Sequence, residues 1–219
     1  YGDLLIEDHL GGVAIDLSNG DFRGGTLSGK NDLLLEFAYA RIEHLENAKI
    51  KLDHKAELEV NTAKSIILES RSSRFRIREV ETVNLISHRD KIRIEKVGPV
   101  KIESSYSYIE IDKLFADLET NGKYGSLTIG EIDEEASDLD MTVENTNINF
   151  NLPESRFLAI ESVYNESAGL FFPSPLRNKV TVKEDEEEKL VKTTGDIGKR
   201  NGKILHLKVR IIDGNLNVK

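Results

Sequence analysis

Residues 75–80 read Phe-Arg-Ile-Arg-Glu-Val, and residues 92–97 read Ile-Arg-Ile-Glu-Lys-Val. Residues 109–114 repeat the pattern as Ile-Glu-Ile-Asp-Lys-Leu, and residues 127–132 repeat it as Leu-Thr-Ile-Gly-Glu-Ile. The four copies start at positions 75, 92, 109 and 127, so they are spaced 17, 17 and 18 residues apart. A second apolar pair recurs with similar spacing, as Val83/Leu85, Val100/Ile102 and Ala116/Leu118. The centre of the chain is therefore an internal repeat.

Apolar and polar residues alternate within each copy, which is the pattern of a β-strand with one buried face. Ile, Val, Thr and Phe, which fill these positions, suit a pleated and half-buried surface. A unit of this length cannot bury its own apolar face, so the copies must stack into a continuous core. The repeat predicts an all-β fold, a parallel β-solenoid (β-helix-like) with short coils of about 17 residues. Phe75, Ile92, Ile109 and Leu127 should then lie above one another, about 4.8 Å apart.

The repeat pattern divides the chain into two parts. Residues 1–162 are predicted to be the solenoid repeat domain, and residues 163–219 a C-terminal coil or hairpin cap continuous with it. A cap is expected because an open coil offers unpaired backbone groups to other chains. Residues 19–32 are rich in Gly, Ser and Asp, which predicts a loop or a loosely formed coil. Charged turns are expected at 133–138 and at 184–189, the second projecting from the cap.

The composition excludes several classes of protein. The net charge of −9 disfavours binding to nucleic acid or to an anionic membrane, because both need a positive field. There is no run of 18 apolar residues, so no transmembrane segment is expected. The absence of cysteine excludes disulfides and thiolate metal sites. Because Tyr1 falls inside a repeat motif, we expect that upstream residues, including a signal peptide, have been removed.

A tyrosine-led motif recurs within the repeats. It reads Tyr-Gly-Asp-Leu-Leu-Ile at 1–6, Tyr-Ser-Tyr-Ile-Glu-Ile at 106–111 and Tyr-Gly-Ser-Leu-Thr-Ile at 124–129, with a weaker copy at 39–44. Together with Asp-Gly-Asn-Leu-Asn-Val-Lys at 213–219, the motif resembles the adhesin β-solenoid family common in Bacteroidetes. The resemblance covers most of the solenoid part and the last strand. It implies a β-helix-like fold and a cell-envelope location (periplasmic, or at the cell surface and secreted), and it brings no catalytic residues.

Six residues that face outward from the central coils are the candidate ligand-binding residues: Arg74, Arg76, Arg78, Lys91, Arg93 and Tyr108. The planar fork of arginine suits an anionic glycan or a carboxylate, and an outward tyrosine can stack against a sugar ring. The alternative is that arginine and glutamate on neighbouring coils pair with each other, each pair contributing at most about 1 kcal/mol. Acidic residues flank the basic ones on both sides, which favours the pairing alternative.

The other candidate residues have structural interpretations. Tyr106 and Tyr124 occupy the same place in the motif, which favours a coil corner with each ring packed on its neighbour and each hydroxyl in water. The five histidines are spread along the chain, with no two at metal-ligand spacing. The acidic runs at 131–135 and 184–188 lack the alternating spacing of a calcium loop. We therefore expect no metal, no cofactor and no enzymatic activity.

The leading hypothesis is a non-catalytic, adhesin-like envelope protein that binds an anionic glycan or a protein partner on the solenoid face, as a monomer or weak oligomer. Two alternatives remain open. The first is a β-helix carbohydrate-active enzyme similar to pectate lyases, although such enzymes usually have longer coils that build a cleft of clustered carboxylates. The second is a scaffold that polymerises end to end, as bactofilin-like solenoids do, although a C-terminal cap would oppose this.

Overall fold

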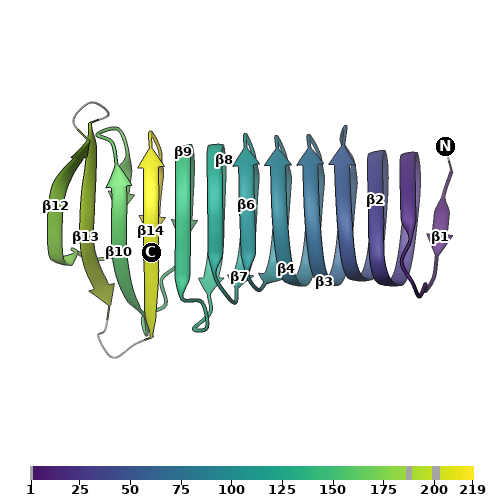
Figure 1. Ribbon diagram of the computed structural model, residues 1–219, viewed down its shortest axis with the longest axis horizontal. Coiled ribbons are helices and arrows are strands. Elements are labelled where there is room, and N and C mark those ends of the chain that lie inside the picture. The colour runs from purple at the N-terminus through teal and green to yellow at the C-terminus, as the bar shows by residue number, and fades with distance from the viewer. Residues whose placement is uncertain (1, 186–188, 199–202) are drawn as a thin grey trace.

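The computed structural model describes residues 2–185, 189–198 and 203–219 (Figure 1). In this part of the chain the strands form a parallel sheet that is wound into a β-solenoid of about 8 turns, with coils of about 18 residues. The predicted all-β solenoid is therefore confirmed. No helix that could cross a membrane occurs among the described residues. Tyr1 and residues 186–188 of the expected turn at 184–189 lie outside the described residues.

The strands follow the coils from one end of the molecule to the other. The N-terminal and central strands are β1 (Leu4–Ile6), β2 (Ala14–Asp53), β3 (Glu57–Arg71), β4 (Arg74–His88), β5 (Lys91–Val97), β6 (Val100–Ser105), β7 (Tyr108–Leu114) and β8 (Leu118–Ile132). The remaining strands are β9 (Asp138–Phe150), β10 (Phe157–Tyr164), β11 (Gly169–Phe171), β12 (Arg177–Asp185), β13 (Leu190–Gly198), β14 (Ile204–Ile212) and β15 (Asn215–Val218). From β1 to β9, neighbouring strands pair in parallel.

Of the two structures expected at 19–32, a loop or a loosely formed coil, the loop is wrong, because these residues belong to the long strand β2, which continues around successive coils. Their glycines reflect close packing of the neighbouring coil. A Cβ atom on Gly25 would lie 1.6 Å from the carbonyl oxygen of Glu7, and one on Gly20 would lie 2.2 Å from that of Gly2. Only glycine fits where the backbones of two coils approach so closely.

The core consists of apolar side chains stacked in register from coil to coil. Phe75, Ile92, Ile109 and Leu127 form one such column, as predicted, and all are buried. Burying each of these side chains stabilises the fold by roughly 1.5–3 kcal/mol. In the second column, however, Leu118 follows Val100, so the expected equivalence of Ala116 with Val100 is wrong. The turn from β7 to β8 is one residue longer than the turn from β5 to β6, and this shifts the register.

One corner of the solenoid has a left-handed backbone in coil after coil. Residues with φ between 48° and 66° recur there: Asn19, Phe37, His54, Ser72, Arg89, Tyr106, Tyr124 and Asn145. Tyr106 and Tyr124 therefore lie at coil corners, as predicted. Non-glycine residues seldom adopt this conformation. Its recurrence shows that the corner is fixed by the stacking of the coils.

A buried carboxylate lies beside this corner. Asp90 is 1% exposed and accepts hydrogen bonds from the Ser73 N–H (2.8 Å), the His88 N–H (2.9 Å) and the Ser87 hydroxyl (2.7 Å). Burial raises the pKa of Asp90, and the hydrogen bonds oppose this rise. Because Ser73 lies on the preceding coil, Asp90 links two successive coils at their corner.

The C-terminal strands are arranged out of sequence order. Strand β14 lies between β9 and β10 and pairs in parallel with both (Figure 1). In the same way β15 pairs in parallel with β9 and β11. The segment 204–218 therefore fills a coil position that the chain skips between β9 and β10. Beyond β10, strands β13 and β12 add an antiparallel hairpin, so the predicted C-terminal hairpin is confirmed.

A buried arginine holds this region together. Arg156, which is 1% exposed, donates hydrogen bonds to the carbonyl oxygens of Glu134 and Ala136 in the turn before β9. It also donates to the carbonyl oxygen of Ile204 at the start of β14, at 3.4 Å. Burial lowers the pKa of its guanidinium group. Arg156 thus joins the turn before β9 to the inserted coil.

Candidate functional site

The outward side chains of β3, β4, β5, β7 and β8 form straight columns, because these strands pair in parallel and in register. The first column contains Glu57, Arg74, Lys91, Tyr108 and Ser126. The second column contains Glu59, Arg76, Arg93, Glu110 and Thr128. Along the solenoid axis the face therefore changes from acidic to basic, then to tyrosine and glutamate, and finally to hydroxyl groups.

These two columns line an open groove with a volume of about 540 Å³. Its apolar floor includes Leu58, Phe75, Ile92 and Ile109, the core residues that lie between the two columns. A volume in this range and an apolar floor with a few polar groups are typical of sites for small ligands. The groove contains five of the six candidate residues: Arg74, Arg76, Lys91, Arg93 and Tyr108.

All three arginines that line this groove form ion pairs with residues of neighbouring coils. Arg74 lies 3.2 Å from Glu57, and Arg76 lies 2.8 Å from Glu95. The pairing alternative is thus confirmed for both.

Arg93 is paired in the same way. It lies 3.0 Å from Asp112 and 3.8 Å from Glu110. The hydrogen bond that Arg93 donates to the Asp112 carboxylate, together with the negative charge of Asp112, raises the pKa of Arg93. Each of the three arginines therefore faces a carboxylate of a neighbouring coil, which offsets part of its charge.

Lys91 and Tyr108 differ from the arginines. They are direct neighbours in the first column, on β5 and β7, and both side chains are exposed, Tyr108 by 62%. Within the described part of the chain, no carboxylate lies at ion-pair distance from Lys91. An exposed ring therefore lies beside an unneutralised ammonium group, above an apolar floor.

The sixth candidate, Arg78, lies outside this groove. It borders a smaller hollow of about 250 Å³ together with Arg41, Glu59, Asn61 and Arg76. The structure thus brings five candidates together and places Arg78 at their side.

The acidic turn at 133–138 forms ion pairs with lysines. Lys113 lies 2.7 Å from Glu131 and 3.3 Å from Asp133, and Lys203 pairs with Glu135. The hydrogen bond from the Glu135 N–H, followed by the contact with Lys113, lowers the pKa of Asp133. These contacts agree with the interpretation of the run as a charged turn.

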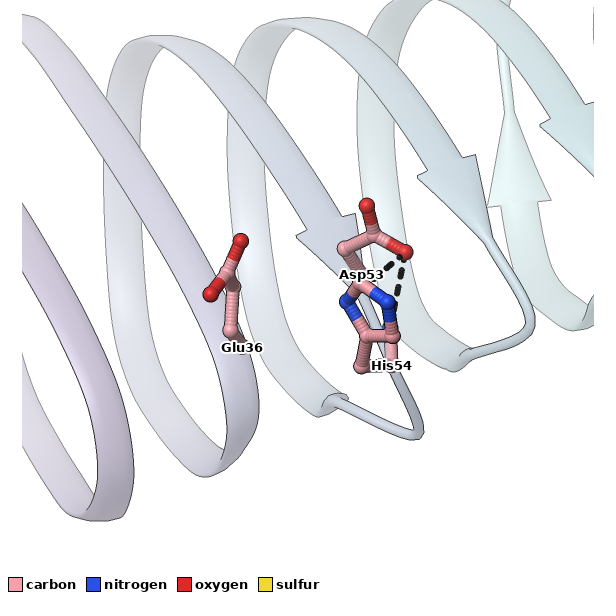
Figure 2. Close-up of side chains that lie close together, drawn as sticks. All are labelled: Glu36, Asp53 and His54. Atoms are coloured by element: carbon pink, nitrogen blue, oxygen red, sulfur yellow. Dashed lines mark hydrogen bonds and ion pairs between the residues drawn. The ribbon is translucent and has the colours of Figure 1, made fainter.

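A second cluster of polar side chains, which the sequence did not lead us to expect, lies on β2 and the turn that follows it. The side chains of Glu36, Asp53 and His54 bring two carboxylates and an imidazole together, with one ligand-type atom of each within 4.8 Å of the others (Figure 2). The repeat itself contains the signal that could have found them. Glu36 and Asp53 are 17 residues apart, which is one coil, and so are Phe37 and His54.

No family model, no curated protein and no solved structure matches this chain. The motif resemblance to adhesin β-solenoids therefore remains an interpretation of the sequence.

Proposed function

We propose that this protein is a non-catalytic, adhesin-like binding module of the cell envelope, and that the groove over β3–β8 binds an anionic glycan. The proposal rests on Lys91 and Tyr108, whose side chains lie next to each other on the paired strands β5 and β7. A sugar ring stacked on the exposed face of Tyr108 would place a carboxylate or sulfate substituent beside the Lys91 ammonium group. The negative charge of the ligand would then neutralise the Lys91 ammonium group, which has no ion-pair partner among the described residues.

The rest of the groove supports a glycan over a purely apolar ligand. Glu59 and Glu110 offer acceptors for sugar hydroxyls, and Ser126 and Thr128 offer both donors and acceptors. Because Arg76 pairs with Glu95 at 2.8 Å, the motion of its side chain is restricted before a ligand arrives, which reduces the entropy lost on binding.

The C-terminal hairpin supports a binding module over an end-to-end polymer. Strand β13 runs antiparallel to β10, so the parallel stacking of coils stops there. A second solenoid could not extend the parallel stack at this end without displacing the hairpin. The proposed cell-envelope location rests on the motif resemblance alone.

The test is a glycan-array screen of the purified protein beside Lys91→Glu, Tyr108→Ala and the double variant Arg76→Glu/Arg93→Glu. Lys49→Glu is the matched control, because Lys49 is an exposed lysine of β2 outside the groove. We expect binding to acidic glycans that is lost in Lys91→Glu, weakened in Tyr108→Ala and retained in the control. Absence of binding by the wild type, or binding that all three groove variants retain, would overturn the proposal and favour a protein partner.

A further inference from the structure

The cluster of Glu36, Asp53 and His54 lies at the left-handed corner of two consecutive coils. Glu36 belongs to one coil, and Asp53 and His54 belong to the next (Figure 2). This corner is on β2 and is separate from the groove over β3–β8. A ligand bound at this corner would therefore be independent of the proposed glycan binding.

Two carboxylates meet here without a lysine or arginine. Among the described residues, neither Glu36 nor Asp53 has an ion pair with a lysine or arginine, and the one ion-pair partner of Asp53 is the imidazole of His54, at 3.3 Å. Other carboxylates of the solenoid pair with a cation of a neighbouring coil, as Glu46 does with Lys64 at 3.0 Å. Like charges on adjacent strands are destabilising, so this corner favours a bound cation.

We propose that Glu36, Asp53 and His54 bind one divalent first-row transition cation that bridges the two coils. Two carboxylate oxygens and one imidazole nitrogen form a mixed donor set that suits Zn²⁺ and its neighbours, whereas Ca²⁺ and Mg²⁺ prefer oxygen alone. Donors around such an ion are about 3 Å apart. The donor atoms of the three side chains lie within 4.8 Å of one another, so they must move closer to reach this spacing.

Two of the ligands are already oriented. The Asp53 carboxylate is 15% exposed and accepts a hydrogen bond from the His54 backbone N–H at 2.9 Å. The imidazole ring of His54 stacks on Phe37 of the preceding coil, with ring centroids 5.1 Å apart and planes 21° apart. Because packing and hydrogen bonding restrict the motion of these groups, less conformational entropy is lost when the ion binds. The exposed side of the cluster leaves further coordination positions open to water.

The test is calorimetric titration of the untagged, chelator-treated protein with Zn²⁺, accompanied by thermal unfolding with and without Zn²⁺. The variants Glu36→Gln and His54→Gln remove one ligand each. Glu43→Gln and His44→Gln are the matched controls, because they make the same substitutions elsewhere on β2. We expect one ion per chain, a higher melting temperature with Zn²⁺, and affinity at least about tenfold lower in both ligand variants.

Three results would overturn the proposal. These are no Zn²⁺ binding by the wild type, binding that Glu36→Gln and His54→Gln leave unchanged, and an equal loss in the two control variants. Titration with Ca²⁺ under the same conditions tests the donor set, since a site with an imidazole ligand should bind Ca²⁺ far more weakly than Zn²⁺.

Discussion

Tyr106 and Tyr124 stack face to face across the boundary between two coils, with ring centroids 4.9 Å apart and ring planes 9° apart. His88 meets the Tyr106 ring edge-on at 5.8 Å, and the Arg89 guanidinium lies 5.7 Å from its centroid. The corner thus continues as a line of interacting side chains along the outside of the solenoid. Both tyrosines also have the left-handed backbone of the corner, so stacking compensates for part of the strain at these positions.

The first prediction concerns this stack. Tyr124→Leu keeps an apolar side chain but removes the ring, so we expect the free energy of unfolding to fall by about 1 kcal/mol. Tyr106→Leu should have a similar effect. In the double variant the loss should be smaller than the sum of the two single losses, because both remove the same contact. Urea denaturation of the four proteins measures this coupling, and strictly additive losses would contradict it.

The second prediction concerns the core. Ile94 is fully buried in the middle of the stack, so Ile94→Asp places an unpaired charge among apolar side chains. We expect an unfolded or insoluble protein. Asn84→Asp, which adds the same charge at an exposed position of β4, is the control and should fold normally. A soluble Ile94→Asp protein with the melting temperature of the wild type would refute the assigned core.

The third prediction concerns the glycine of the Tyr-Gly motif. A Cβ atom on Gly125 would lie 2.2 Å from the Ser107 carbonyl oxygen of the preceding coil, so Gly125→Ala must push two coils apart. We expect a loss of about 1–3 kcal/mol in the free energy of unfolding. Gly122→Ala, on the same strand, should lower the free energy of unfolding by less. The atom nearest to its new Cβ would be the Ser104 hydroxyl oxygen, 3.3 Å away, and a side-chain hydroxyl can rotate aside. Equal effects of the two variants on chemical denaturation would count against this explanation.

The fourth prediction concerns pH. Burial raises the pKa of Asp90 in the folded state above its value in the unfolded chain, so the folded state holds the proton more tightly. The stabilisation from this proton is complete below the unfolded pKa of about 4 and is lost as the pH rises through the folded pKa. Asp90→Asn removes the titration. The stability of the wild type relative to Asp90→Asn should therefore decrease from about pH 4 towards neutral pH.

Denaturation of both proteins across this range measures the difference. A difference that stays constant with pH, or one that increases towards neutral pH, would contradict the assigned direction of the Asp90 shift.

The repeat allowed most of the solenoid to be predicted, because alternation and period determine which side chains are buried. Ile92 and Ile109 could be placed above one another from their spacing alone. The segment 19–32 was misread because glycine is typical of loops and also of closely packed backbones, and one sequence does not distinguish the two. Ala116 was misaligned because one added residue in a turn shifts the register without disturbing the strand pattern.

The location of the candidate site could be predicted from the sequence, but the ion-pair partners of its arginines could not. The spacing of the repeat identifies Arg76 and Arg93 as neighbours, yet which carboxylate each one contacts depends on side-chain rotamers. The same spacing is a signal for the meeting of Glu36 with Asp53, which was not predicted. Arg156 carried no sequence signal, because a buried arginine that binds carbonyl oxygens looks like any surface arginine in a charged stretch.

The insertion of β14 between β9 and β10 has a consequence for the order of folding. A solenoid can usually grow coil by coil as the chain is synthesised, each coil packing on the one before it. Here β10 and the hairpin of β12 and β13 that pairs with it emerge from the ribosome before residues 204–218, the coil that joins them to β9. Strand β10 must therefore wait for its parallel partner, which lies 47 residues further along the chain (Phe157 with Ile204). Such non-local closure is slow, so this end of the protein becomes protected only after residues 204–218 have been made.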